Sequence, residues 1–261
     1  MLTRLKRKLS SLVWSSRTFV NKTFFLNRLL RESAGLHLGC GETHMEGFLN
    51  VDYRATRSAD IAHDCSDLSF IKPESVGTVY SNAFLEHLYL DQRLQCLQNV
   101  RSILRKTGLA VFLSIPDFRR IAQAYLNDEV GIVGDRFDLY NVYRYTHGAP
   151  EIARSWYLQQ LHKSLFDQES LAQLLTEAGF AHYVIFRFCF RDEPVPVNLG
   201  FVASKGARVG DADADKISEI VSRYSKDVNL RTVTRLLGFD SAPTQLKNRA
   251  SNPQVAAAKF Q

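Results

Sequence analysis

The chain has 261 residues, of which 45% are hydrophobic and 23% are charged, so it can form one sizeable globular domain. Its four cysteines are widely spaced and form no CxxC pair, which argues against a zinc site and against a disulfide framework, and we expect no metal. No run of about 18 apolar residues occurs, so we expect no membrane span and a cytoplasmic location.

Residues 1–31 form a strongly basic segment. They hold eight Lys or Arg side chains and no acid, so the net charge of +6 leaves −2 on the rest of the chain. Their apolar residues at helical spacing are Leu2, Leu5, Leu9, Leu12 and Val13. The pattern predicts a basic amphipathic arm that either packs on the domain or adsorbs to the anionic inner face of a membrane. An organelle-targeting segment is a further interpretation.

Short strands and helices alternate from residue 35 onward. The expected strands cover residues 35–38, 48–52, 58–64, 77–81 and 109–115. A helix before the last of these has Asp91 as its N-cap and Gly108 at its C-terminal cap. Repeated strand and helix units of this kind predict a parallel sheet with helices on both faces.

The second half of the chain continues this pattern. A helix begins at Asp167 and ends at Gly179, and it is followed by two strands, 183–190 and 198–204, that resemble an antiparallel pair closing the sheet. Residues 117–162 are rich in tyrosine and suit a substrate lid. Beyond Lys205, one helix around Ile217 is expected before a polar, mobile end.

Two glycines and two acids follow the first three strands. Gly39 and Gly41 have no side chain, so the backbone can approach a ligand there, and the N–H groups that follow can face an anionic group. Asp52 can accept two ribose hydroxyls, and Asp64 can accept an adenine amino group. Ordinary turns and helix caps use the same residue types. Because parallel strands place their carboxyl ends at one ligand-binding edge, the order of the four residues predicts a nucleoside site.

The motifs around these residues resemble those of a known family. They are Leu36-His37-Leu38-Gly39-Cys40-Gly41, Gly47-Phe48-Leu49-Asn50-Val51-Asp52, Asn82-Ala83-Phe84-Leu85-Glu86-His87-Leu88, Ile115-Pro116-Asp117 and His162-Lys163-Ser164-Leu165-Phe166-Asp167. Together they look like the small class I S-adenosylmethionine-dependent methyltransferases associated with bacterial cell-surface polysaccharide synthesis. The resemblance covers roughly residues 35–205, and it is carried by the combination more than by any single motif.

This resemblance implies a Rossmann-like α/β fold with a seven-stranded mixed sheet over residues 35–205. The arm over 1–34 precedes it, and an extension over 206–261, partly helical and then disordered, follows it. The resemblance also implies S-adenosyl-L-methionine as cofactor and methyl transfer to an oxygen of a saccharide or related metabolite. The expected cofactor-binding residues are Gly39, Cys40, Gly41, Asp52, Tyr53, Asp64, Cys65 and Asn82.

Two positions depart from the family pattern. The usual acid before the glycine turn is His37, and the usual third glycine is Thr43. We interpret His37 as a hydrogen-bonded strand histidine rather than a cofactor ligand. These departures leave open a methyltransferase-like domain without catalysis that serves as a scaffold.

Methylation of a sugar hydroxyl benefits from a base within hydrogen-bond reach, because the hydroxyl pKa is very high. The candidate bases are His162, His147, Asp117 and His87. We favour His162, which precedes a helix start and lies beside Lys163, a side chain that could neutralise an anionic substrate. Each candidate could instead be structural, as a helix cap or as a hydrogen-bonded histidine.

Two other enzyme classes fit the sequence less well than a methyltransferase of saccharides. A nicotinamide-dependent enzyme acting on nucleotide sugars needs a third glycine where His44 stands, and no YxxxK pair occurs. Nucleic-acid methylation fits the basic arm, but the near-neutral body lacks a continuous basic face, and we expect no nucleic-acid partner. Asp211, Asp213 and Asp215 mimic a metal-binding motif, and helix capping explains them better.

Overall fold

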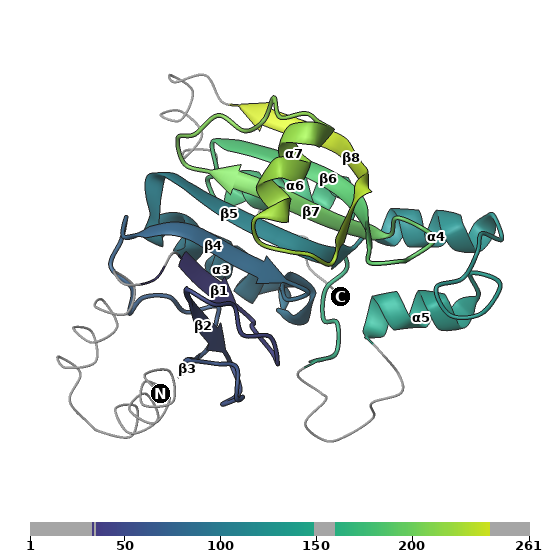
Figure 1. Cartoon of the computed structure of the whole chain (residues 1–261), viewed down its shortest axis with the longest axis horizontal. Coiled ribbons are helices and arrows are strands. Elements are labelled where there is room, and N and C mark those ends of the chain that lie inside the picture. Colours follow the sequence, from purple (N-terminus) through teal and green to yellow (C-terminus); the bar gives the residue numbers. More distant parts are fainter. Residues whose placement is uncertain (1–32, 34, 149–159, 241–261) are drawn as a thin grey trace, which may run out of the picture.

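The computed structural model describes residue 33 and residues 35–148 and 160–240 (Figure 1). Eight strands form one mixed sheet in the order β3-β2-β1-β4-β5-β7-β6-β8. Their bounds are β1 Gly35–Leu38, β2 Phe48–Asp52, β3 Ile61–Ala62, β4 Val76–Asn82, β5 Leu104–Pro116, β6 His182–Phe190, β7 Asn198–Ser204 and β8 Val228–Asp240. The expected arm, apart from Ser33, and residues 241–261 of the expected extension lie outside the described residues.

The sheet has a parallel half and an antiparallel half. Strands β3, β2, β1, β4 and β5 run parallel to one another, whereas β7 is antiparallel to both β5 and β6. This arrangement confirms the expected α/β sheet closed by an antiparallel pair. The expected number of seven strands is wrong, because β8 from the predicted extension pairs with β6 as an eighth strand.

Helices cover both faces of this sheet. They are α3 Leu90–Ile103, α4 Phe118–Leu126, α5 Leu139–His147, α6 Gln168–Glu177 and α7 Ala214–Ser222, with a short 3₁₀ helix η1 at Leu85–His87. Helices α3 and α6 share one core cluster with the sheet, and α7 contributes to a second cluster. Helices α4 and α5 lie beyond the end of the sheet (Figure 1), where they pack on each other and on Val195 and Val197. No helix in the described part is long and apolar enough to cross a membrane.

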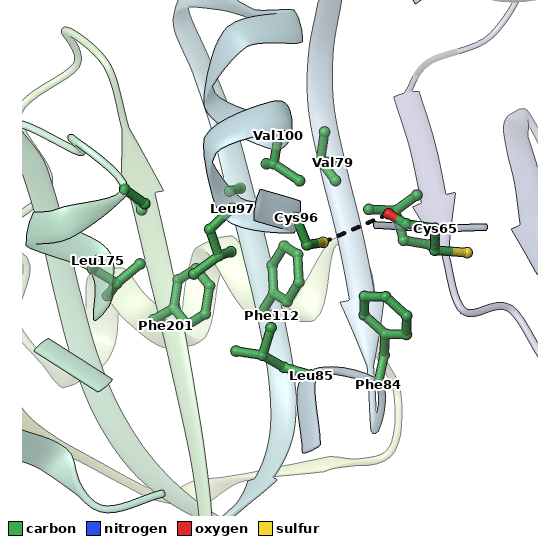
Figure 2. Packing of buried hydrophobic residues seen from close by; sticks show 14 of the residues in the cluster. Cys65, Val79, Phe84, Leu85, Cys96, Leu97, Val100, Phe112, Leu175 and Phe201 are labelled. Carbon is green, nitrogen blue, oxygen red and sulfur yellow. Dashed lines mark hydrogen bonds between the residues drawn. The ribbon is translucent and has the colours of Figure 1, made fainter. Parts of the chain in front are cut away.

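The larger core cluster is centred on Phe112 of β5 (Figure 2). Its ring stacks on Phe201 of β7 at 4.9 Å between centroids, so the parallel and antiparallel halves share one core. Beside it, the thiol of Cys96 in α3 donates to the carbonyl of Cys65 at 3.6 Å. Burial of a large apolar side chain stabilises a fold by roughly 1.5–3 kcal/mol, which makes this cluster a main source of stability.

The ends of the helices were predicted with mixed success. Asp167 caps α6 as expected, and Asp213 caps α7, each by accepting a backbone N–H three residues later. Asp91 does not cap α3, because the helix begins at Leu90 and Asp91 lies inside it. The N-cap residue is Tyr89, whose N–H donates to the side chain of Gln92 at 3.1 Å. Gly108 is not a helix cap either, because α3 ends at Ile103 and the chain continues as β5.

The connection from β1 to β2 contains no helix. Parallel strands are usually joined by a crossover of a dozen or more residues, most often helical. Here residues 39–47 alone make the connection, as turns and bends. The glycine turn therefore does not lead into a helix, and residues 39–47 return directly from the carboxyl end of β1 to the amino end of β2.

Candidate functional site

The turn after β1 has a conformation that favours glycine. Gly39 and Gly41 have φ angles of 63° and 53°, in the left-handed region. A β-carbon on Gly39 would lie 2.6 Å from the ring of Phe84, which follows β4. The turn can pass this close to the end of β4 only because position 39 has no side chain.

Asp52 joins this turn to the loop after β2. Its carboxylate accepts the N–H groups of Gly41 and Arg54, both at 2.8 Å, and the residue is 7% exposed. A carboxylate has about four acceptor positions, so about half of them remain for ligand hydroxyls. The N–H of Gly41 donates to Asp52, so this N–H is not available to an anionic ligand.

A cavity of about 600 Å³ opens at the carboxyl ends of β1, β2 and β4. The strand order reverses at β1, and doubly wound sheets bind ligands in the crevice at such a point. All eight residues expected to bind the cofactor line this cavity: Gly39, Cys40, Gly41, Asp52, Tyr53, Asp64, Cys65 and Asn82. The structure thus brings together side chains that are spread over more than forty positions of sequence.

The end of β4 presents a polar atom that has no partner. The side-chain oxygen of Asn82 is buried and accepts no hydrogen bond from any described residue. The next residue, Ala83, has a φ of 50°, which costs energy for a side chain other than glycine. An unsatisfied buried polar atom costs roughly 1–3 kcal/mol, so a ligand donor at this point would stabilise the site.

The wall near β3 combines an exposed acid with buried thiols. Asp64 is exposed, and one of its carboxylate oxygens accepts the N–H and the hydroxyl of Ser66 at 2.9 and 2.8 Å. Cys40 and Cys65 are buried, and burial raises the pKa of each thiol to about 12. Both thiols are therefore neutral near pH 7.

His37 and Thr43, the two departures from the family pattern, have different roles. His37 is buried, and its Nδ1 lies 3.0 Å from the side-chain oxygen of Asn50 in β2. It is therefore the hydrogen-bonded strand histidine that the sequence predicts, and it is not part of the cavity wall. Thr43 does line the cavity, and its N–H donates to the Cys40 carbonyl at 2.8 Å, which closes the turn.

Of the four candidate bases, His87 is the one on the cavity wall. Its Nδ1 donates to the carbonyl of Leu161 at 3.3 Å, and burial lowers its pKa to about 4. His162 lies behind it, with ring centroids 4.9 Å apart and the rings edge to face. The Nδ1 of His162 donates to the Tyr145 carbonyl at 2.7 Å. These two histidines, far apart in sequence, form one pair next to the cavity.

Asp117 and His147 lie outside the cavity wall and are not part of the pair formed by His87 and His162. Asp117 is fully buried, and one of its oxygens accepts from Arg187 at 2.6 and 2.9 Å while the other caps α4. Its carboxylate thus carries an ion pair and a helix cap, which corrects its assignment as a base. His147 is exposed at the end of α5, where its ring stacks on Tyr143 at 4.6 Å, and it does not line the cavity.

The sequence analysis assigned no role to Glu86, although this residue belongs to the motif over residues 82–88. Its side chain is 2% exposed, and its Oε2 has no hydrogen-bond partner among the described residues. Burial raises its pKa to about 8. Its own carbonyl accepts the N–H groups of Lys163 and Ser164 at 2.8 and 3.1 Å, which holds that segment against η1. The signal available in the sequence was an acid next to His87 in an otherwise apolar stretch.

The chain is similar to several solved structures at low identity. A methyltransferase from Thermotoga maritima, described as a possible histamine N-methyltransferase, is 17% identical, covers 72% of this chain and 96% of its own, and has a TM-score of 0.43. One from Archaeoglobus fulgidus is 16% identical, with coverage of 72% and 95% and a TM-score of 0.44.

A third similar structure contains S-adenosylhomocysteine. The 1,6-didemethyltoxoflavin-N1-methyltransferase of Burkholderia thailandensis, solved with S-adenosylhomocysteine, is 15% identical, covers 78% and 86% of the two chains, and has a TM-score of 0.38. No protein-family profile and no curated protein matches the chain. The description of the fold therefore rests on the strand order and strand directions of this chain itself.

Proposed function

We propose that this chain is an S-adenosylmethionine-dependent methyltransferase that methylates an oxygen of a saccharide or a related metabolite. The observation that carries the proposal is a cavity at the point where the strand order reverses, lined by all eight residues that were expected to bind the cofactor.

The chain offers a matching group for each part of the cofactor. Asp52 would accept the ribose hydroxyls with its remaining acceptor positions, and Asp64 with the neighbouring Cys65 backbone would contact the adenine. The unpartnered oxygen of Asn82 would accept from the amino group of the methionine portion, which removes its penalty for burial. Lys163, a cation on the cavity wall, would neutralise an anionic group of the cofactor or the acceptor.

The remaining task of the protein is to orient the acceptor and to receive its proton. When bound, the cofactor supplies a sulfonium methyl group: an oxygen lone pair forms the new C–O bond, and the C–S electron pair stays on sulfur. Alignment of the two reactants in a dry cavity provides most of the rate. His87 is neutral and lines the cavity, so it is better placed than His162 to receive the proton of the hydroxyl.

Nicotinamide chemistry is less well supported. A dinucleotide fingerprint places the pyrophosphate at the start of a helix that follows the glycine turn. In this chain residues 39–47 form no helix. No described feature favours a second enzymatic function over methyl transfer.

The proposal is tested by calorimetric titration with S-adenosylmethionine and, separately, with NAD. We expect the first to bind and the second not to bind. Asp52→Ala should weaken binding of S-adenosylmethionine by at least tenfold, because each lost charge-assisted hydrogen bond contributes about 1.5–3 kcal/mol. Asp67→Ala, at an exposed turn that accepts from Ser69, is the matched control and should bind as the wild type does.

Far-UV circular dichroism and thermal unfolding check that both variants are folded. Equal affinity of the wild type and Asp52→Ala for S-adenosylmethionine would overturn the assignment of the cofactor site. Binding of NAD in place of S-adenosylmethionine would overturn the reaction class.

A further inference from the structure

Glu86, His87 and His162 bring three ligating side chains to one point beside the cavity. Each offers one ligating atom, and these atoms all lie within 4.8 Å of one another. The Oε1 of Glu86 is 3.7 Å from the Nε2 of His87. The first two residues come from η1, and the third comes from the segment that hydrogen-bonds to η1 through Lys163 and Ser164. The fold itself therefore assembles the cluster.

The two histidines are oriented as metal ligands are. The Nδ1 of each ring faces a backbone carbonyl, that of Leu161 for His87 and that of Tyr145 for His162. Because a carbonyl only accepts, each Nδ1 carries the proton, and in a neutral ring the Nε2 then has a free lone pair. Metal-binding histidines almost always use a carbonyl or carboxylate in this way to fix the ring and its tautomer.

One oxygen of the carboxylate in this cluster is buried without a hydrogen-bond partner among the described residues. Glu86 is nearly fully buried, and its Oε2 has no partner among the described residues. Burying an ionised carboxylate without a counter-charge is very costly. Lys163 does not provide that counter-charge, because its ammonium donates to the His87 carbonyl at 3.0 Å and lies over the Tyr89 ring.

A direct hydrogen bond between Glu86 and His87 does not explain the arrangement. The 3.7 Å between Oε1 and Nε2 is longer than a hydrogen bond. The Nδ1 of His87 already donates to the Leu161 carbonyl, so the unprotonated Nε2 of the neutral ring is the atom that faces Glu86. Glu86 and His87 are thus close to each other but form no direct hydrogen bond.

We propose that Glu86, His87 and His162 bind one divalent transition-metal ion. Two imidazoles and one carboxylate form a donor set that suits Zn²⁺ or Fe²⁺, and both commonly leave a coordination position open to substrate. Bonds of about 2.1 Å at tetrahedral angles separate ligating atoms by about 3.4 Å. The observed separations of up to 4.8 Å require small side-chain rotations on binding.

The ion would act on the acceptor. His87 belongs to the cavity wall, so an ion held by its Nε2 would lie beside a bound acceptor and would lower the pKa of the hydroxyl to be methylated. With the ion bound, this effect would replace proton transfer to His87, because the same Nε2 lone pair would then be a metal ligand. This role rests on the proposed methyltransferase function. Binding of the metal does not, because it depends only on the three side chains and their supporting carbonyls.

The test uses the untagged full chain, freed of metal with EDTA and then titrated calorimetrically with ZnCl₂. We expect one Zn²⁺ per chain, and affinity at least tenfold lower in Glu86→Gln and in His162→Ala, since each removes one of three protein ligands. His182→Gln is the matched control: His182 pairs with Asp240 at 2.7 Å, outside the cavity, and this variant should bind Zn²⁺ as the wild type does. Visible absorption of Co²⁺ gives a second readout of the coordination geometry.

Thermal unfolding confirms that each variant is folded, and Glu86→Gln preserves the shape of the side chain if His162→Ala does not fold. Absence of Zn²⁺ binding by the wild type, or equal affinity in the wild type and in folded Glu86→Gln, would overturn the proposal. Binding of S-adenosylmethionine is measured in parallel. If the chain binds Zn²⁺ but not S-adenosylmethionine, the metal site stands and the proposed function is overturned. If it binds S-adenosylmethionine but not Zn²⁺, the proposed function stands and the metal site is overturned.

Discussion

The positions of residues at the ends of strands were predicted well, because these positions follow from local pattern alone. Gly39, Asp52 and Asn82 each end or follow a short apolar strand, and parallel strands place such ends at one edge. Asp117 was misjudged for the opposite reason. Its partner Arg187 is seventy positions away, and only tertiary packing brings the two together. Sequence pattern does not contain that information.

His37 illustrates how a buried histidine links stability to pH. Burial lowers its pKa in the folded chain below the usual value of about 6.5. As pH falls through 6.5, the unfolded chain takes up a proton at this residue and the folded chain does not. The unfolded state then binds more protons, so the free energy of unfolding decreases toward low pH.

We therefore expect His37→Gln to reduce this dependence. Urea unfolding at pH 5, 6 and 7 should give a slope of unfolding free energy against pH that is smaller than in the wild type by up to one proton, about 1.4 kcal/mol per pH unit. The glutamine amide can still donate to Asn50. Identical slopes in the two proteins would show that His37 does not contribute to the pH dependence.

At the scale of elements, the sequence predicted the parallel half of the sheet and missed β8. The strands of the parallel half are short apolar runs bounded by turn residues, a pattern typical of a buried strand. Strand β8 mixes apolar residues with the exposed Arg231 and Arg235 and contains Gly238 near its end, so it has no clean alternation. It forms because β6 offers an unpaired edge, which is a property of the assembled sheet.

The end of β8 packs against the loop at Gly210. Asp240 accepts the N–H of Gly210 at 3.2 Å, and a β-carbon on Gly238 would overlap the carbonyl oxygen of Gly210. Gly238→Ala should therefore lower the free energy of unfolding by about 1–3 kcal/mol, as overpacking does. Thr234→Ala, at an exposed position of the same strand, should change it by less than about 0.5 kcal/mol in the same urea titration. Equal values for the two variants would show that β8 tolerates a shift at Gly210.

At the scale of the whole molecule, charge is divided unequally along the chain. Residues 1–31 hold eight basic side chains and no acid, and the rest of the chain is slightly acidic. We propose that this segment binds an anionic membrane surface and that the rest of the chain contributes little to this binding. Each basic residue near such a surface is worth about 1 kcal/mol, an attraction that salt weakens.

Deletion of residues 2–31 tests this division. We expect the full chain to sediment with vesicles that contain anionic phospholipid, and the deletion variant to sediment at least tenfold less at the same lipid concentration. Vesicles of neutral phospholipid and a high-salt buffer are the controls, and both should abolish sedimentation of the full chain. Undiminished sedimentation of the deletion variant would show that the rest of the chain makes the membrane contact. Affinity for S-adenosylmethionine should be the same in both proteins.

The buried thiols of Cys40 and Cys65 have a chemical consequence for an enzyme of the proposed kind. A sulfonium methyl group is an electrophile, and a thiolate beside it would be alkylated. With a pKa of about 12, each thiol is ionised in only about one molecule in 100,000 at pH 7. The desolvated wall that shapes the cavity thus also protects the protein from methylating itself.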